Sequence, residues 1–146
     1  MNKNRFFVIF LVAVIFIIAL LLASCQEEGE VVSKPDEHTR SFEVSENTIL
    51  RVIVHVFREK AFGNAKIDSE KNRVESDYIT QNGWRSKCIA RVKKINWKEC
   101  DVTLSVITEK KTSTGWEMRR LLEKEQYDSI FDAIDLQIYR EMYKVK

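Results

Sequence analysis

The feature that most limits how this chain can fold is an apolar run close to its N-terminus. Residues 6–23 include no charged or polar side chain, and two basic residues, Lys3 and Arg5, come before them. A basic segment followed by an apolar run is typical of a secretory signal peptide. The run is also close to the length of a transmembrane helix, because about 20 apolar residues cross the roughly 30 Å hydrocarbon layer. Hydropathy alone therefore leaves two interpretations, a removable signal peptide and an uncut membrane span.

The residues that end this run favour the removable signal peptide. Leu22-Ala23-Ser24-Cys25 resembles the lipobox of bacterial lipoproteins. In that class the Cys thiol accepts a diacylglycerol, a peptidase cuts just before the Cys, and the new amino group often receives a further fatty acid such as palmitate. The resemblance implies that residues 1–24 are a signal peptide, that cleavage falls between Ser24 and Cys25, and that Cys25 carries the lipid.

The same resemblance implies where the mature chain would be held. One acyl chain binds a bilayer only marginally, whereas two or three hold a protein there stably. Gln26 is not the Asp that favours inner-membrane retention in proteins of this class. We therefore expect attachment to the cell membrane through the lipid on Cys25, on the periplasmic face of the outer membrane if the organism has two membranes.

Charge and length limit the class of the mature protein. The whole chain has 24 basic and 22 acidic residues, and Lys3 and Arg5 are the only charged residues of the signal segment, so the mature chain is formally neutral. Net charge therefore gives no support for a nucleic-acid partner. The roughly 120 residues that remain are enough for one domain with a modest core.

The stretch after Cys25 predicts a flexible tether. Residues 26–40 contain several acids and Pro35, with only Val31 and Val32 to bury. Such a composition does not supply the apolar burial that ordering a chain requires. We therefore expect a tether over residues 25–41, which would hold the folded part off the membrane, and a single α+β domain over residues 42–146.

Residues 45–62 fit two periodicities. Their apolar residues occur at helical spacing, but several also alternate as in a strand. Ser45 as an N-cap and Gly63 past the end favour a helix, whereas the β-branched content favours a strand. We expect a helix, with the strand as the alternative.

The rest of the domain predicts a sheet and a closing helix. Short strands are expected over 65–67 and 74–79, and a longer hairpin over 85–94 and 101–109, where apolar and polar residues alternate. Residues 124–143 have the apolar spacing of an amphipathic helix. The expected fold is α+β, a four-stranded antiparallel sheet with the long C-terminal helix and the N-terminal helix packed on one face.

Two cysteines remain once Cys25 is lipidated. In the predicted hairpin Cys100 lies opposite about residue 94. At about 3.4 Å per residue this position is roughly 20 Å along the sheet from Cys88, beyond the ~7 Å limit between the Cα atoms of a disulfide. We therefore predict two free, buried thiols. The remaining zinc-ligand candidates, His38 and His55, are distant from each other and from both Cys and have no ligand spacing.

The order of these elements resembles a known lipoprotein domain. A helix, a short hairpin, a basic strand, a Val-rich strand and an amphipathic helix after Trp116 are similar to the helix-grip domain of BamC-type outer-membrane lipoproteins. The segments that carry the resemblance, over most of residues 42–143, are Lys66-Ile67-Asp68, Ser86–Val92, Asp101–Val106 and Glu125–Ile134. The resemblance implies a role in outer-membrane protein assembly. The chain has one such domain, fewer than the larger members of the family.

The sequence offers no arrangement typical of catalysis. It has no nucleophilic Ser elbow, and its four Gly are too far apart for a phosphate-binding loop. We interpret His55 as a packing residue of the first helix and His38 as an exposed tether residue. Asp128, Asp132 and Asp135 fall on the polar side of the last helix, which predicts a solvated face rather than a metal site. We expect no enzyme activity, no cofactor and no bound metal.

A group of basic and aromatic residues in and after the basic strand is the candidate interaction surface. Its members are Trp84, Arg85, Lys87, Arg91, Lys93 and Trp97. Such a surface could contact anionic headgroups, peptidoglycan or an acidic protein. The alternative is an ordinary solvated sheet face, because that face needs charges and Lys discourages edge pairing.

Together these patterns predict a lipid-anchored, non-catalytic module that binds another envelope protein, with no small-molecule substrate. One alternative is a protein that binds a small apolar ligand or lipid in the cleft between helix and sheet. A roomy cavity under the last helix would favour that alternative, and a filled core would favour the interaction module. The other alternative is an uncut single-span subunit of a membrane complex.

Overall fold

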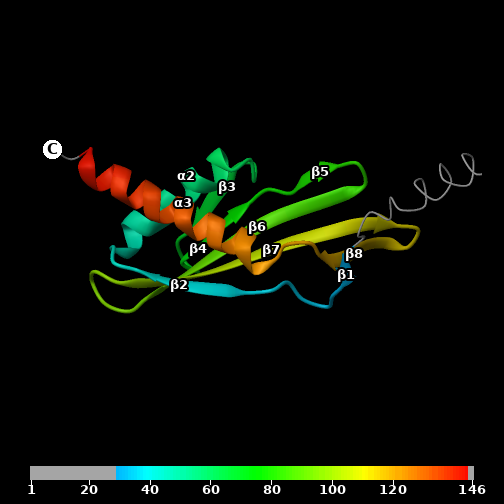
Figure 1. The fold of residues 1–146 in the computed structure, drawn as a ribbon, viewed down its shortest axis with the longest axis horizontal. Coiled ribbons are helices and arrows are strands. Elements are labelled where there is room, and N and C mark those ends of the chain that lie inside the picture. Colours follow the sequence, from blue (N-terminus) through cyan, green and yellow to red (C-terminus); the bar gives the residue numbers. More distant parts are fainter. Residues whose placement is uncertain (1–28, 145–146) are drawn as a thin grey trace, which may run out of the picture.

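The computed structural model describes residues 29–144. The predicted signal peptide, its cleavage site at Ser24 and the lipid site at Cys25 lie outside these residues. Within them the chain forms two helices and eight strands (Figure 1). The helices are α2 (Glu46–Glu59) and α3 (Lys124–Tyr143). The strands are β1 (Glu30–Val31), β2 (His38–Phe42), β3 (Ala65–Asp68), β4 (Arg73–Ser76), β5 (Ile79–Gln81), β6 (Trp84–Lys94), β7 (Cys100–Thr112) and β8 (Gly115–Arg120).

The hairpin of β6 and β7 is the central and longest strand pair of the sheet. It pairs from Trp84 with Lys110 to Lys94 with Cys100. At one end, β4 and then β3 extend the sheet beyond β6, and β2 extends it beyond β7. At the other end, β5 lies beside β6, and β8 and then β1 lie beyond β7. We call the end with β1, β5 and β8 the β1 end, and the end with β2, β3 and β4 the helix end. All strand pairs among the described residues are antiparallel.

The expected four-stranded sheet is wrong, because the described residues form an eight-stranded one. The combination of helices with an antiparallel sheet is roughly as expected. The four strands that were not expected are β1, β2, β5 and β8. They are short or rich in polar residues, so the alternation of apolar side chains that marks a strand in the sequence is missing from them. Backbone pairing holds them instead: β2, β5 and β8 pair with the β6–β7 hairpin, and β1 pairs with β8.

Part of the predicted tether over residues 25–41 also belongs to the sheet. Residues 30–31 form β1 against β8, and β2 pairs with residues 100–104 of β7. Phe42 ends β2 inside the core, with its ring 6.1 Å from that of Phe131 on α3. The acidic composition of this stretch did not reveal the pairing, because the stretch contributes backbone hydrogen bonds and ion pairs rather than apolar burial.

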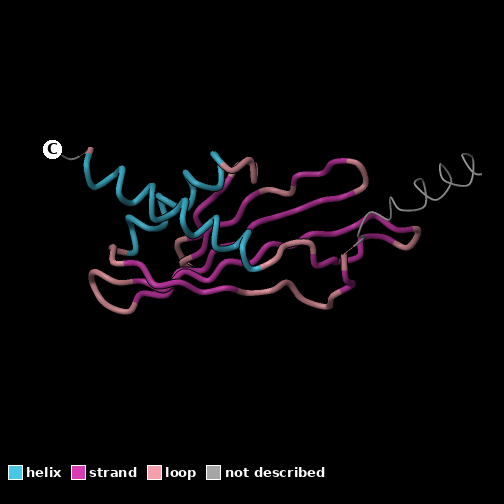
Figure 2. The backbone as a smooth tube through the Cα atoms, viewed as in Figure 1, coloured by secondary structure: helices cyan, strands magenta, loops and turns pink. Residues whose placement is uncertain are grey.

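The predicted helices and the predicted hairpin are confirmed. The Ser45 hydroxyl caps α2 by accepting from the Thr48 N–H at 3.4 Å, and the chain leaves the helix through Ala61 and Gly63, whose φ angles are 60° and 83°. At the start of α3 the Glu123 N–H donates to Gln126 Oε1 at 2.5 Å. Both helices lie on one face of the sheet, toward the helix end (Figures 1 and 2).

The core lies between this face and the two helices. It is formed by alternate residues of β6 and β7 together with the apolar sides of α2 and α3. Its fully buried members include Ile49, Ile53, Phe57, Cys88, Ala90, Val102, Leu104 and Ile134. Cys88 and Cys100 are both buried and free, as predicted. Burial raises the pKa of the Cys88 thiol to about 12.

Candidate functional site

A cavity of about 460 Å³ opens on the helix-bearing face of the sheet, at the β1 end, beyond the region that the helices cover. Its apolar lining comes from segments far apart in the sequence: Phe62, Ile79, Trp84, Val106, Leu121 and Leu122. Its polar lining is formed by Gln81, Asn82, Arg85, Ser86 and Thr108. The volume falls within the range of about 300–1,000 Å³ that is common for ligand sites. We call it the β1-end cavity.

Alternation along β6 and β7 explains where this cavity forms. Ser86 pairs with Thr108 and lies on the same face as the next pair toward the helices, Cys88 with Val106. Side chains on one strand face alternate sides, so the parity of Cys88 also places Trp84 on this face. The floor of the cavity therefore carries two small polar side chains, Ser86 and Thr108, beside the buried pair of Cys88 and Val106.

A tight turn holds one wall of the cavity in place. β5 and β6 are joined by Asn82 and Gly83, whose φ angles of 51° and 77° are those of a two-residue hairpin turn. Asn-Gly is the strongest short signal for such a turn in a sequence. Residues 82–83 therefore carry a sequence signal for β5, although the three residues of β5 have no apolar alternation.

Gly29 packs on the rim of the cavity. A Cβ on Gly29 would lie 2.5 Å from Leu121 Cδ2 and 2.6 Å from the Arg120 carbonyl oxygen, so only Gly fits there. Its φ of 64° also favours Gly. Arg119 Nη1 donates to the Gly29 carbonyl oxygen at 3.1 Å. Gly29 is therefore held against the end of β8, beside this cavity.

Exposed apolar side chains gather at the opposite end of the molecule. One group is in the β6–β7 turn, and the other is on the last turns of α3, where the Tyr139 and Tyr143 ring centroids are 4.2 Å apart. Figure 1 shows that both lie far from β1. We call these the distal residues: Ile95, Trp97, Leu136, Tyr139, Met142 and Tyr143. Trp97 is the most exposed of them, at 72%.

The six residues of the predicted interaction surface are not brought together. The side chains of Arg85, Lys87, Arg91 and Lys93 lie on the face of β6 opposite Cys88, away from the helices, and Arg85 also borders the β1-end cavity. Trp84 lines the β1-end cavity on the other face, and Trp97 is in the turn at the helix end. Consecutive residues of β6 do not form one surface, because residues of odd and even number on a strand face opposite sides.

Three of these basic residues already have acidic partners. Arg85 Nε lies 2.5 Å from Glu109 Oε2, and the guanidinium sits between the Tyr78 and Trp116 rings, at 4.5 Å and 4.4 Å. Lys87 pairs with Glu75 at 2.6 Å and Arg91 with Glu37 at 2.5 Å. The hydrogen bond from Lys87 lowers the pKa of Glu75. These pairs reduce the positive potential that the basic strand would otherwise present.

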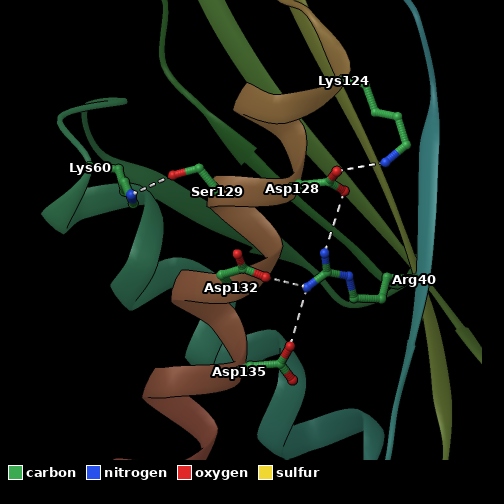
Figure 3. A network of polar contacts seen from close by, with 7 residues as sticks. All are labelled: Arg40, Lys60, Lys124, Asp128, Ser129, Asp132 and Asp135. Atoms are coloured by element: carbon green, nitrogen blue, oxygen red, sulfur yellow. Dashed lines mark hydrogen bonds and ion pairs between the residues drawn. The ribbon is translucent and has the colours of Figure 1, made fainter.

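Asp128, Asp132 and Asp135 surround the guanidinium of Arg40, a residue of the predicted tether. Arg40 Nη1 lies 2.7 Å from Asp132 and 3.3 Å from Asp135, and Nη2 lies 3.4 Å from Asp128 (Figure 3). The prediction of a merely solvated face is therefore incomplete, because these carboxylates hold β2 against α3. Among residues 29–144 no group of three His, Cys, Asp or Glu side chains is arranged to hold a metal ion.

The two histidines have different surroundings. His55 lies on α2 with Nε2 3.1 Å from Glu59 Oε1, and half of its side chain is exposed. His38 is not an exposed tether residue, because it lies in β2 with its ring 4.2 Å from that of Tyr127. The Tyr127 hydroxyl in turn accepts from the Val106 N–H at 3.4 Å. Both histidines therefore have structural neighbours.

None of the helices in residues 29–144 has the length and apolar content needed to cross a bilayer. No protein-family model matches this chain, and no curated protein matches it in sequence. The resemblances to lipobox-bearing lipoproteins and to the BamC-type domain therefore stay predictions.

Proposed function

We propose that this protein is a lipid-anchored, non-catalytic envelope module that is attached to the membrane through Cys25 and binds a partner protein through the distal residues. The observation that carries the proposal is the separation of two features along the molecule. The N-terminal part of the chain joins the domain at the β1 end, and the exposed aromatic side chains lie at the other end (Figure 1).

The length of chain before the domain supports this orientation. Cys25 is four residues before Gly29, so a lipid on Cys25 would lie within about 14 Å of the rim of the β1-end cavity. β6 has 11 residues and runs away from that end. At roughly 3.3 Å per residue it spans about 35 Å, so the domain would present Trp97 well away from the bilayer.

The chemistry of the distal residues suits a protein partner. Tyr and Trp are enriched among residues that contribute most to protein–protein binding, because their large rings bury much surface with little loss of rotamer freedom. Leu136, Tyr139 and Tyr143 fall at spacings of three and four on α3, so they share one side of the helix. A single helix face of this kind fits a groove on another protein.

The filled core favours this function over a ligand site under α3. Cys88, Ala90 and Leu104 face the helices and have no exposed surface. An apolar ligand in the cleft between helix and sheet would have to displace them. The β1-end cavity lies outside that cleft.

Two measurements test the proposal. The intact mass of the membrane-extracted protein, compared with a Cys25→Ala variant, reports the anchor: loss of residues 1–24 together with added acyl mass is expected in the wild type only. The mass of the complex in mild detergent reports the partner: we expect the wild type in a species heavier than its monomer, and the Trp97→Ala/Tyr139→Ala variant as the monomer. A wild type that keeps residues 1–24, or that runs as a bare monomer, contradicts the corresponding half of the proposal.

A further inference from the structure

We propose that the β1-end cavity is a membrane-docking site, and that its occupant is the phospholipid surface to which the chain is attached. This inference rests on the membrane attachment in the proposed function. It would make the bilayer a partner of the folded domain as well as of the lipid on Cys25.

The position of Gly29 is the first argument. Its backbone packs directly on Leu121, which lines the cavity, and Arg119 fixes its carbonyl oxygen. The apolar run of residues 6–23 ends only six residues before Gly29. Lipid on Cys25 and an uncut membrane span would both bring the bilayer to within about 20 Å of the cavity rim, at no more than ~3.5 Å per residue.

The apolar character of the rim is the second argument. Val31, Ile79 and Leu121 are 53%, 37% and 39% exposed, although each is a large apolar residue. Val31 pairs with Arg119, and the register of β7, β8 and β1 places it on the same face of the sheet as the cavity. In the part of the chain that the structure describes, both helices lie toward the other end of this face (Figure 2). A bilayer would cover these side chains.

The position of Trp84 in the cavity also supports docking to a bilayer. Its ring lines the cavity, and Lys110 Nζ lies 5.6 Å from the ring centroid. An indole ring has an apolar body and one N–H donor, so it is suited to the boundary between headgroups and acyl chains.

The test uses Trp84 as the reporter in the full-length mature protein. Trp97→Phe and Trp116→Phe leave Trp84 as the only Trp, and the protein is reconstituted in phosphatidylcholine–phosphatidylglycerol vesicles whose acyl chains carry bromine, a contact quencher. We expect Trp84 to lose most of its emission relative to unbrominated vesicles. A matched protein that keeps only Trp97, at the opposite end, should retain its emission.

Two single substitutions check the contact surface. Leu121→Asp places a charge on the cavity rim and should restore the Trp84 emission. Ile67→Asp, at an equally exposed site on β3 outside both proposed surfaces, should leave the quenching unchanged. Flotation of the vesicles reports attachment independently of the emission. A protein that floats with unquenched Trp84, or a Leu121→Asp variant that stays quenched, overturns the docking site and leaves the anchor standing.

A protein that does not float overturns the proposed attachment instead. Docking is then tested by adding brominated vesicles to the unattached protein. If Trp84 keeps its emission in that experiment, the docking site is overturned as well. A polypeptide partner as the true occupant would give the same unquenched result, since the vesicles contain lipid only.

Discussion

Arg40 shows how one residue can order a stretch of chain that composition describes as flexible. It is one of the few basic residues in the acidic stretch before α2, and it lies in β2 facing α3. Its guanidinium is shared by three Asp of α3 and lies 4.9 Å from the Phe131 ring centroid. Its partial burial acts against the charged form, but the hydrogen bonds and charges of Asp132 and Asp135 outweigh that cost and raise the pKa of Arg40.

Replacing Arg40 should therefore cost more than replacing an ordinary surface Arg. Arg40→Met keeps much of the stem but leaves three carboxylates without their shared cation. We expect the free energy of unfolding to fall by about 1 kcal/mol, the upper part of the range for exposed ion pairs, because several charges form one network. Urea denaturation measures the change, with Arg51→Met on the exposed side of α2 as the control that should change little.

The same cluster gives a pH dependence with a defined sign. The hydrogen bond from Lys124 is the main cause that lowers the pKa of Asp128, so this group is charged more readily in the folded chain than in the unfolded one. Its contribution to stability is present above the unfolded pKa and disappears as the pH falls through the folded pKa. Asp128→Asn should thus be less stable than the wild type at pH 7, and the two melting temperatures should converge in acid. A gap that widened below pH 4 would contradict this assignment.

At the scale of single elements, local signals determined what the sequence could predict. α2, α3 and the β6–β7 hairpin carry strong periodicity and, for α2, a cap at Ser45, so their residues specify them without outside help. β1, β2 and β8 pair with edges that the rest of the fold provides, and their own residues do not encode those edges. The β1-end cavity depends on where the helices stop relative to the hairpin, a relation between distant segments that periodicity does not contain.

The β5–β6 turn is the element whose contribution is easiest to isolate. Gly83 has a φ of 77° and nothing within 4 Å of a Cβ built on it, so Gly83→Ala would strain only the backbone. We expect a loss of about 1 kcal/mol, the usual cost of a left-handed conformation for a residue with a Cβ. Asn82→Gly, at the other left-handed position, should be close to neutral. Hydrogen exchange of the β5 amides would locate the effect, and equal exchange in Gly83→Ala and wild type would refute it.

At the scale of the whole molecule, the short segment between Cys25, the proposed lipid site, and Gly29 is the main geometric constraint on the proposed docking. Inserting about ten Gly and Ser residues between Cys25 and Gly29 would add a flexible linker with a reach of roughly 5–6 Å times the square root of its length. The domain would then no longer be held against the bilayer. We expect unchanged flotation but weaker quenching of Trp84 by brominated lipid. An inserted linker with no effect on the emission would show that the contact does not depend on the tether.

The arrangement of the strands also has a mechanical consequence. A domain held by lipid at the β1 end and by a partner at the distal residues would be loaded along its length, nearly parallel to β2, β6 and β7. The hydrogen bonds of an antiparallel sheet lie perpendicular to its strands, so such a pull would shear them together rather than open them one at a time. The five paired residues of β2, fastened to α3 through Arg40, would bear that load before the core did. The acidic stretch whose composition predicts a tether would then transmit the force between the membrane and the folded domain.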